Sequence, residues 1–267
     1  YIVWPDARNG DPFINQIYLN SSSDFGETWK NEVRIDHSPK NVSADYPAIA
    51  ADHNGNVYVA WTSNVQAGPQ RGVFSNRSGD DGTTWLEEDE RIDNVPDGYS
   101  PGRLYFAGSG EPRPLWTNDE GRVYIFFATG DGSRSIIGIN SSSDFGVTWG
   151  IARDVIVRRY VEPSHYIFPV QVTADQLGRL YIAAAIGRLD EMPPRLHNFV
   201  NASPDGGETF ACGDQGCQVD PIDPSEDINL TAVSISNNHE GKVAMVWSDN
   251  RNGTGQHIYY RPARFEK

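Results

Sequence analysis

The stretch Ser22-Ser23-Asp24-Phe25-Gly26-Glu27-Thr28-Trp29 contains the pattern that decides the fold, S-x-D-x-G-x-T-W. The same eight-residue box returns at residues 78–85 and 142–149, and a fourth copy at residues 203–210 ends in Phe210 instead of Trp. The copies lie roughly 60 residues apart, which is the spacing of repeated supersecondary units. The chain is therefore built from repeats.

Short apolar runs separated by turns surround each box. The runs upstream of the boxes include residues 57–61, 123–127 and 180–184, and a fifth run at residues 243–247 has no box after it. Gly-containing turns precede these runs, and another short apolar segment precedes each turn. No stretch keeps an apolar period of 3.6, so each unit holds four short strands, A to D, and helix is nearly absent.

Repeated units of four antiparallel strands predict an all-β fold, a β-propeller of four-stranded blades. The B strands are almost continuously apolar, as expected when neighbouring blades cover both faces of a sheet. We place the repeats at about residues 1, 46, 113, 166 and 228, within a single domain of residues 1–267. The first repeat lacks strand A and the last lacks strand D, so five blades are visible and further upstream sequence would complete a sixth.

The box lies between strands C and D, where its Gly supplies the positive φ of a tight turn. Its Asp is expected to accept hydrogen bonds from the turn's own backbone, and its aromatic residue is expected to insert between blades. Symmetric repetition favours architecture over catalysis or calcium binding. The structural set is Asp24, Trp29, Asp80, Trp85, Asp144, Trp149, Asp205 and Phe210.

These boxes resemble the Asp-box, also called the bacterial neuraminidase repeat, which occurs in sialidases and in other glycan-active propellers. The resemblance covers essentially the whole chain and implies that ligands bind at the face opposite the boxes, built by the B–C and D–A connections. For a sialidase it further implies an Asp acid, a Tyr–Glu pair as nucleophile and base, and an arginine cluster for the sialic acid carboxylate. The catalytic candidates are Tyr160, Glu162 and Asp97, while the Arg-Ile-Pro signature usual in sialidases is absent.

Residues that break the repeat are the better ligand candidates, because repetition points to architecture. The long D–A connections mix arginines with aromatic and acidic residues, which suits sugar recognition. The predicted ligand-binding residues are Arg71, Arg103, Arg113, Arg134, Arg158, Arg159, His165, Tyr166 and Arg195. By contrast, the near-identical B–C loops that hold Asp6 with Arg8 and Asp249 with Arg251 favour a structural ion pair.

The cysteines and the glycosylation sequons indicate an oxidising compartment. Cys212 and Cys217 bracket a Gly-containing loop and suit a disulfide, hence an extracellular or cell-surface protein. Seven sequons exceed chance and predict a glycoprotein: Asn20, Asn41, Asn76, Asn140, Asn201, Asn229 and Asn252. Four of these asparagines, Asn20, Asn76, Asn140 and Asn201, lie two residues before a box serine.

Charge and composition exclude several function classes. The formal net charge of −14 over 267 residues opposes nucleic-acid binding, and no apolar stretch is long enough to insert into a membrane. The scattered histidines give no metal pattern, so neither a metal nor a cofactor is expected. Three functions remain open: a propeller that recognises glycans, an exo-glycosidase of sialidase type, and a non-catalytic component of an extracellular surface assembly.

Overall fold

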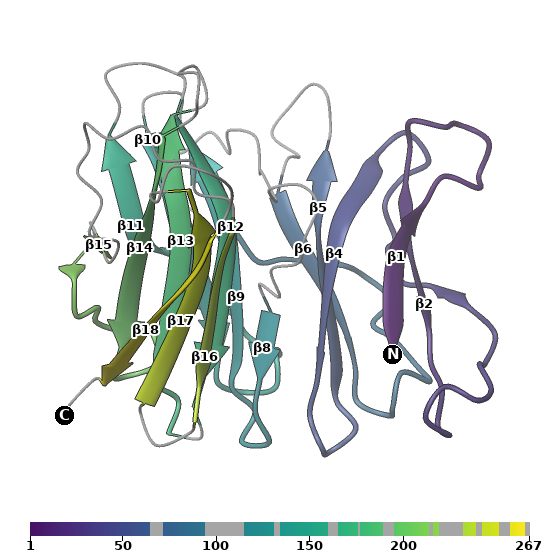
Figure 1. The fold of residues 1–267 in the computed structure, drawn as a ribbon. Helices are drawn as coiled ribbons and strands as arrows, with labels where there is room; N and C mark the ends of the chain where they lie inside the picture. The colour runs from purple at the N-terminus through teal and green to yellow at the C-terminus, as the bar shows by residue number, and fades with distance from the viewer. Residues whose placement is uncertain are drawn as a thin grey trace. The chain divides into compact units, whose positions relative to one another are not determined.

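The computed structural model describes the backbone of residues 1–64, 72–93, 115–130, 134–159, 165–175, 177–188, 195–213, 216–218, 232–238, 242–250 and 257–264. Antiparallel strands dominate this part of the chain, and no α-helix occurs in it (Figure 1). The all-β prediction is therefore confirmed. The described residues show sheets of three and four strands, and neither a closed ring nor a blade number is established by them.

The strands form five sheets, one for each predicted repeat, in which sequence neighbours pair (Figure 1). The first has the order β1(Ile2–Asp6)-β2(Gln16–Asn20)-β3(Val33–Arg34), and the second β4(Ser43–Ala51)-β5(Val57–Asn64)-β6(Gly72–Ser78)-β7(Glu90–Arg91). The third is β8(Leu115–Thr117)-β9(Val123–Gly130)-β10(Arg134–Ser142)-β11(Arg153–Arg159). The fourth is β12(His165–Ala174)-β13(Leu180–Arg188)-β14(Arg195–Ser203)-β15(Cys217–Gln218), and the fifth β16(Ala232–Asn237)-β17(Lys242–Asp249)-β18(His257–Arg264). The first sheet thus lacks an A strand and the fifth lacks a D strand among the described residues, as the repeats predict.

Two compact units divide the chain. The first unit comprises Tyr1–Pro101, Leu115–Ile125 and Asn140–Ala152, and the second comprises Gly102–Pro114, Phe126–Ile139 and Arg153–Lys267. The single-domain assignment stays a prediction.

Each unit has its own apolar core, built around the B strands. In the first unit, Ile17, Leu19 and Ile35 pack with Val59 and Trp61. In the second unit, the core combines β13, β14, β16 and β17, and its residues are Tyr181, Ala183, Ala185, Val200, Ala202, Ile235, Val243, Met245 and Trp247. In β5, residues 57–63 are all buried, so both faces of that strand are covered. This burial explains why the B strands are continuously apolar instead of alternating.

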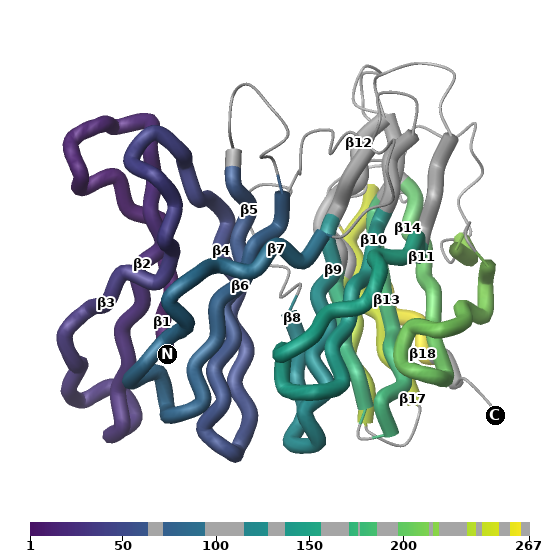
Figure 2. The backbone as a smooth tube through the Cα atoms, turned by 180° about the vertical axis from the view of Figure 1, so that it is seen from behind, coloured from purple at the N-terminus to yellow at the C-terminus, as the bar shows by residue number. Residues whose placement is uncertain are grey.

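The A–B turn and the C–D box lie at the same end of each four-stranded sheet, because adjacent strands run in opposite directions. Figure 2 shows this for the second sheet, where the β4–β5 turn and the connection that leaves β6 point the same way. We call this the box end of a sheet. The B–C and D–A connections leave from the other end, which we call the open end.

Candidate ligand-binding site

The four boxes share one hydrogen-bond pattern. In the first box, the Ser22 hydroxyl donates to Asp24 Oδ1 at 2.6 Å and accepts from the Gly26 N–H at 2.8 Å. Thr28 closes the turn, because its N–H donates to Asp24 Oδ1 at 2.9 Å and its hydroxyl donates to Oδ2 at 2.5 Å. The other boxes repeat these bonds through Ser78, Asp80 and Thr84, through Ser142, Asp144 and Thr148, and through Ser203, Asp205 and Thr209.

Those hydrogen bonds keep the box carboxylates ionised. The bonds from Ser22 and Thr28 lower the pKa of Asp24 to about 2. Thr84 and Ser78 lower the pKa of Asp80 to about 2, and Thr148 and Ser142 do the same for Asp144. Burial raises the pKa of Asp205, but the bonds from Thr209 and Ser203 outweigh it, so the pKa stays below its usual value. A carboxylate with both oxygens engaged in this way stabilises its own turn. A ligand-binding site is therefore expected at the open end of the sheets and not at the box end.

The aromatic residues of the boxes are only partly buried, and Trp85 packs against the core that the first and second sheets share. Trp29 is 46% exposed, and Trp85, Trp149 and Phe210 are half-buried. The ring also lies over its own turn: a Cβ on Gly26 would lie 3.7 Å from the Trp29 ring, and the Trp85 indole N–H donates to the Gly82 carbonyl at 3.2 Å.

Three of the predicted glycosylation sites are structural asparagines in the folded chain, and their burial argues against a glycan on them. Asn76, Asn140 and Asn201 are 1%, 2% and 0% exposed. The amide nitrogen that a glycan would occupy already donates twice: from Asn140 to the Ile92 and Gly150 carbonyls at 2.6 and 3.1 Å, and from Asn201 to those of Val155 and Gly213 at 2.9 and 2.7 Å.

The remaining sequons differ from these three. Asn20 is half-buried and its Oδ1 accepts from the Ser21 N–H at 2.7 Å, while Asn41 is exposed. Asn229 and Asn252 lie outside the described residues. Among the three buried asparagines, Asn76 makes the most hydrogen bonds. Its amide donates to the Leu86 carbonyl at 3.1 Å and to Asp89 Oδ1 at 3.3 Å.

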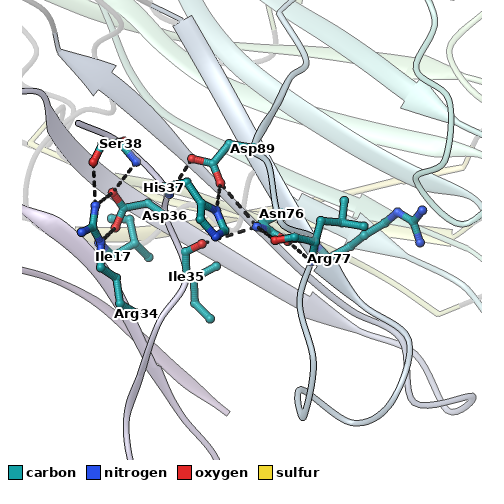
Figure 3. Close-up of polar contacts among 10 residues, drawn as sticks. Ile17, Arg34, Ile35, Asp36, His37, Ser38, Asn76, Arg77 and Asp89 are labelled. Atoms are coloured by element: carbon teal, nitrogen blue, oxygen red, sulfur yellow. Dashed lines mark hydrogen bonds and ion pairs between the residues drawn. The ribbon is translucent and has the colours of Figure 1, made fainter.

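Figure 3 shows how Asn76 joins the first sheet to the second. Its amide also reaches the Ile35 carbonyl at 3.4 Å, next to His37, whose N–H and Nδ1 contact Asp89 at 2.7 and 2.9 Å. Beside it, buried Asp36 accepts the Ile17 N–H at 2.7 Å and pairs with Arg34 at 3.0 Å. Sequence reasoning missed this Arg-Ile-Asp element, although it recurs as Arg91, Ile92 and Asp93, where Arg91 pairs with Asp93 at 2.6 Å.

The first B–C loop contains the structural ion pair that its sequence predicts. Arg8 pairs with Asp6 at 2.5 Å and with Glu32, and its guanidinium lies 4.2 Å from the centre of the Tyr18 ring. Asp6 also accepts the Trp4 indole N–H at 3.2 Å. The last sheet repeats the indole bond, from Trp247 to Asp249 at 3.0 Å, while Arg251 lies outside the described residues.

The predicted ligand-binding and catalytic residues lie either outside the described residues or in strands for which only the backbone is described. Arg71, Asp97, Arg103, Arg113, Tyr160 and Glu162 lie outside the described residues. Arg134, Arg158, Arg159, His165, Tyr166 and Arg195 have a described backbone, and their side chains lie outside the described part. Their positions in the sheets are therefore what the structure adds.

Strand register gathers these residues at open ends. Arg134 is the first residue of β10 and its register partner is Arg159, the last residue of β11. In the fourth sheet, His165 at the start of β12 is paired with Arg188 at the end of β13, which is paired with Arg195 at the start of β14. Arg158 stands next to Arg159 in β11, and Tyr166 stands next to His165 in β12.

Arg188 is a residue that sequence reasoning missed. It closes the apolar run of β13, and a charged residue at the end of such a run was the available signal.

Contacts within the second unit show that these open ends lie on the same side. At the box end, Arg153 on β11 pairs with Glu208 in the next box at 2.5 Å, and further along β11 the Val155 carbonyl accepts from Asn201 on β14. Because their box ends are joined, the open ends of β10–β11 and of β12–β14 point the same way. Two rows of basic residues thus share one side of this unit.

The cysteine prediction is confirmed, since Cys212 and Cys217 form a disulfide. In the described part of the chain, no helix is long and apolar enough to cross a membrane. Among those same residues, no group of three or more His, Cys, Asp or Glu side chains is placed to hold a metal ion.

Comparison with known proteins gives a fold and no family. No protein-family profile matches the chain, and no curated protein sequence matches it. Solved structures do: the α-L-arabinanase of Penicillium chrysogenum with arabinobiose has a TM-score of 0.54 and 19% identity, covering 82% of this chain and 62% of that one. The GH93 α-L-arabinofuranosidase of Fusarium graminearum has 0.55 and 15%, covering 86% and 66%.

A PL25 ulvan lyase, solved bound to -[GlcA(1-4)Rha3S]-, is similar to the same extent, with a TM-score of 0.55 and 11% identity over 93% of this chain and 64% of that one. The chain thus spans a little under two thirds of the length of these three proteins. They are carbohydrate-active propellers, and at such identities the likeness shows the fold alone.

Proposed function

We propose that this protein binds an anionic glycan at the open ends of the third and fourth sheets. One observation carries the proposal: register places Arg134 with Arg159, and His165 with Arg188 and Arg195, at strand ends on one side of the second unit. Guanidinium groups bind carboxylate and sulfate in a bidentate manner, which suits uronic acids and sulfated sugars.

The overall charge sharpens this proposal. Against a formal net charge of −14, rows of basic residues are a local exception, and local fields guide anionic ligands. The box ends have the opposite character, because their carboxylates are ionised and already bonded to their own turns.

The similar structures support a glycan ligand. The arabinanase and the arabinofuranosidase were solved with arabinobiose, a neutral sugar, and the ulvan lyase was solved with an anionic saccharide that contains glucuronate and sulfate. The disulfide agrees with work outside the reducing cytosol, where polysaccharides are met, and we place the protein at the cell surface or beyond it.

The test is a binding titration with a sulfated, uronate-containing oligosaccharide. In the Arg134→Ala/Arg159→Ala variant we expect about tenfold or greater weakening, because two charge-assisted contacts are lost together. Arg153→Ala is the matched control, since Arg153 stands at the box end of the same strand that Arg159 closes. Equal affinities for wild type and both variants would move the site elsewhere.

Turnover is the second function to test, because the similar structures include hydrolases and a lyase. We propose Tyr160 and Glu162 as nucleophile and base, with Asp97 as the acid, for an exo-glycosidase of sialidase type. Hydrolysis of a fluorogenic sialoside that Glu162→Gln abolishes would support this function. Glycan binding without turnover would leave a recognition module, and neither binding nor turnover would favour a component of a surface assembly.

A further inference from the structure

Two Asn-Gly pairs lie among the described residues: Asn9-Gly10 in the connection between β1 and β2, and Asn54-Gly55 in the turn between β4 and β5. Asparagine before glycine is prone to attack by its own main chain, because the glycine nitrogen has no side chain beside it to block its approach to the asparagine side-chain carbonyl. The surroundings of each pair decide whether that approach is open in the folded chain.

The first pair is exposed and makes no hydrogen bond to the rest of the described chain. Asn9 and Gly10 are both exposed, and beyond the neighbouring residues no atom lies within 4 Å of the position that a Cβ on Gly10 would take. Among the described residues, no group bonds the Asn9 side-chain amide or the Gly10 N–H. The nitrogen and the carbonyl carbon that must meet are therefore unrestrained.

The residue before this pair is fixed, so the turn keeps its place. The Arg8 N–H donates to Asp6 Oδ1 at 2.8 Å, and the Arg8 guanidinium pairs with Asp6 and Glu32. The last register pair of β1 and β2 is Asp6 with Gln16, so the turn projects beyond the ladder. A strand that paired along the outer edge of β1 would meet residues 2–6 and leave this turn uncovered.

The second pair consists of the same two residues, but its surroundings hold it. The Asn54 side-chain amide donates to the Asp119 carbonyl at 2.9 Å, and the Asn54 N–H donates to Asp52 Oδ1 at 2.9 Å. A Cβ on Gly55 would lie 3.2 Å from Asp81 Oδ1, so a carboxylate lies beside this glycine. The attacking nitrogen must give up its proton, and a nearby negative charge disfavours the anion that forms.

We propose that Asn9 is a site of spontaneous deamidation and that the fold protects Asn54 from the same reaction. The Gly10 nitrogen forms a bond to Asn9 Cγ, the bond from Cγ to Nδ2 breaks, and the side-chain nitrogen leaves as ammonia with the proton that the Gly10 nitrogen gave up. Water then opens the succinimide ring. Aspartate results when the new bond from nitrogen to Cγ breaks, and isoaspartate results when the original peptide bond breaks.

The product places a new carboxylate beside Arg8, which already pairs with the carboxylates of Asp6 and Glu32. The chain gains a negative charge, and in isoaspartate the main chain also gains a methylene group at residue 9. Neither change removes a ladder hydrogen bond, because Asn9 and Gly10 lie outside β1 and β2. Aged protein is therefore expected as a folded charge variant that is altered at the open end of the first sheet.

The test follows both pairs in the same sample. The chain is kept in mildly alkaline buffer, and peptide mapping by mass spectrometry, with an isoaspartate-specific methyltransferase, measures conversion at Asn9 and Asn54 over time. In the folded chain we expect Asn9 to convert about tenfold faster or more, because conversion at Asn54 must wait for local opening. In urea the two rates should come within about threefold of each other, because the fold no longer protects either pair.

Two variants serve as controls, and both change an exposed residue. Asn9→Asp carries the charge of the product from the start, so it should co-elute with the aspartate form of aged wild type on ion exchange and keep the melting temperature within about 2 °C. Asn9→Gln should remove the aged fraction, because a longer side chain closes the ring far more slowly. Equal rates at Asn9 and Asn54 in the folded chain would overturn the proposal, as would an Asn9 that stays intact in folded protein while the unfolded chain converts.

Discussion

Asn201 on β14 donates its side-chain N–H to the Val155 carbonyl on β11 at 2.9 Å, so an amide of the fourth sheet holds a main-chain group of the third. The same amide reaches the Gly213 carbonyl at 2.7 Å, and its oxygen accepts the Ala202 and Cys212 N–H groups at 3.0 and 3.1 Å. One buried side chain thus fastens its own box connection and the preceding sheet. A glycan on this nitrogen would replace one of its two hydrogens, so at least one of the two donor contacts would be lost.

Loss of such an amide should destabilise the fold. Asn140→Ala removes the side-chain donor to the buried Ile92 carbonyl and to the Gly150 carbonyl, and we expect a loss of about 1–3 kcal/mol in the free energy of unfolding, measured by urea denaturation. Asn41→Ala, at an exposed sequon, is the control and should change stability by less than about 0.5 kcal/mol. Similar effects for the two variants would contradict the structural role of Asn140.

Glycosylation should follow burial and not the sequon pattern. When the protein is secreted from a eukaryotic host, peptide mapping by mass spectrometry should find Asn76, Asn140 and Asn201 unmodified, because their amides are buried and donate hydrogen bonds. Asn41 is the exposed site at which sugar is expected. A glycan on Asn140 in folded protein would show that the interpretation of these amides is wrong.

Box carboxylates should make stability fall in acid. The pKa of Asp144 is about 2 in the folded chain, whereas an unfolded Asp titrates at about 3.9. A lowered folded-state pKa contributes stability that is fully present above the unfolded value and is lost as the pH falls through the folded value. The melting temperature of Asp144→Asn should therefore lie furthest below wild type above about pH 4.

The gap between the two melting curves should narrow as the pH falls from about 4 towards about 2, because the wild-type carboxyl then becomes protonated. Asp81→Asn is the control, since Asp81 is exposed on a neighbouring box and outside the Ser–Asp–Thr pattern. A gap for Asp144→Asn that stays constant over this pH range would argue against the ionised turn.

Tryptophans in the box and in the core should behave differently. Trp61 is 1% exposed in the first-unit core, and Trp61→Ala should cost about 3–5 kcal/mol in unfolding free energy. The Trp29 ring contacts Gly26 of its own turn, and Trp29→Ala should lower the free energy of unfolding by about 1 kcal/mol or less. Equal losses in urea denaturation would mean that the box ring packs more deeply than the structure shows.

The sequence by itself determined the strands, their antiparallel order and the hydrogen-bonded boxes, because these depend on local turn chemistry and on apolar runs that repeat. Asp24 accepts a hydrogen bond from Thr28, four residues away, and the spacing of these residues in the sequence is enough to predict such a contact. It also determined the disulfide between Cys212 and Cys217, whose loop is short.

The tertiary structure decided what depends on a neighbouring sheet. Asn140 looks like a sequon in the sequence, and only the position of the Ile92 carbonyl, 48 residues earlier, makes it a buried donor. Strand register, which pairs Arg134 with Arg159 and Arg188 with Arg195, depends on how whole strands align with one another, and no single residue pair in the sequence determines it.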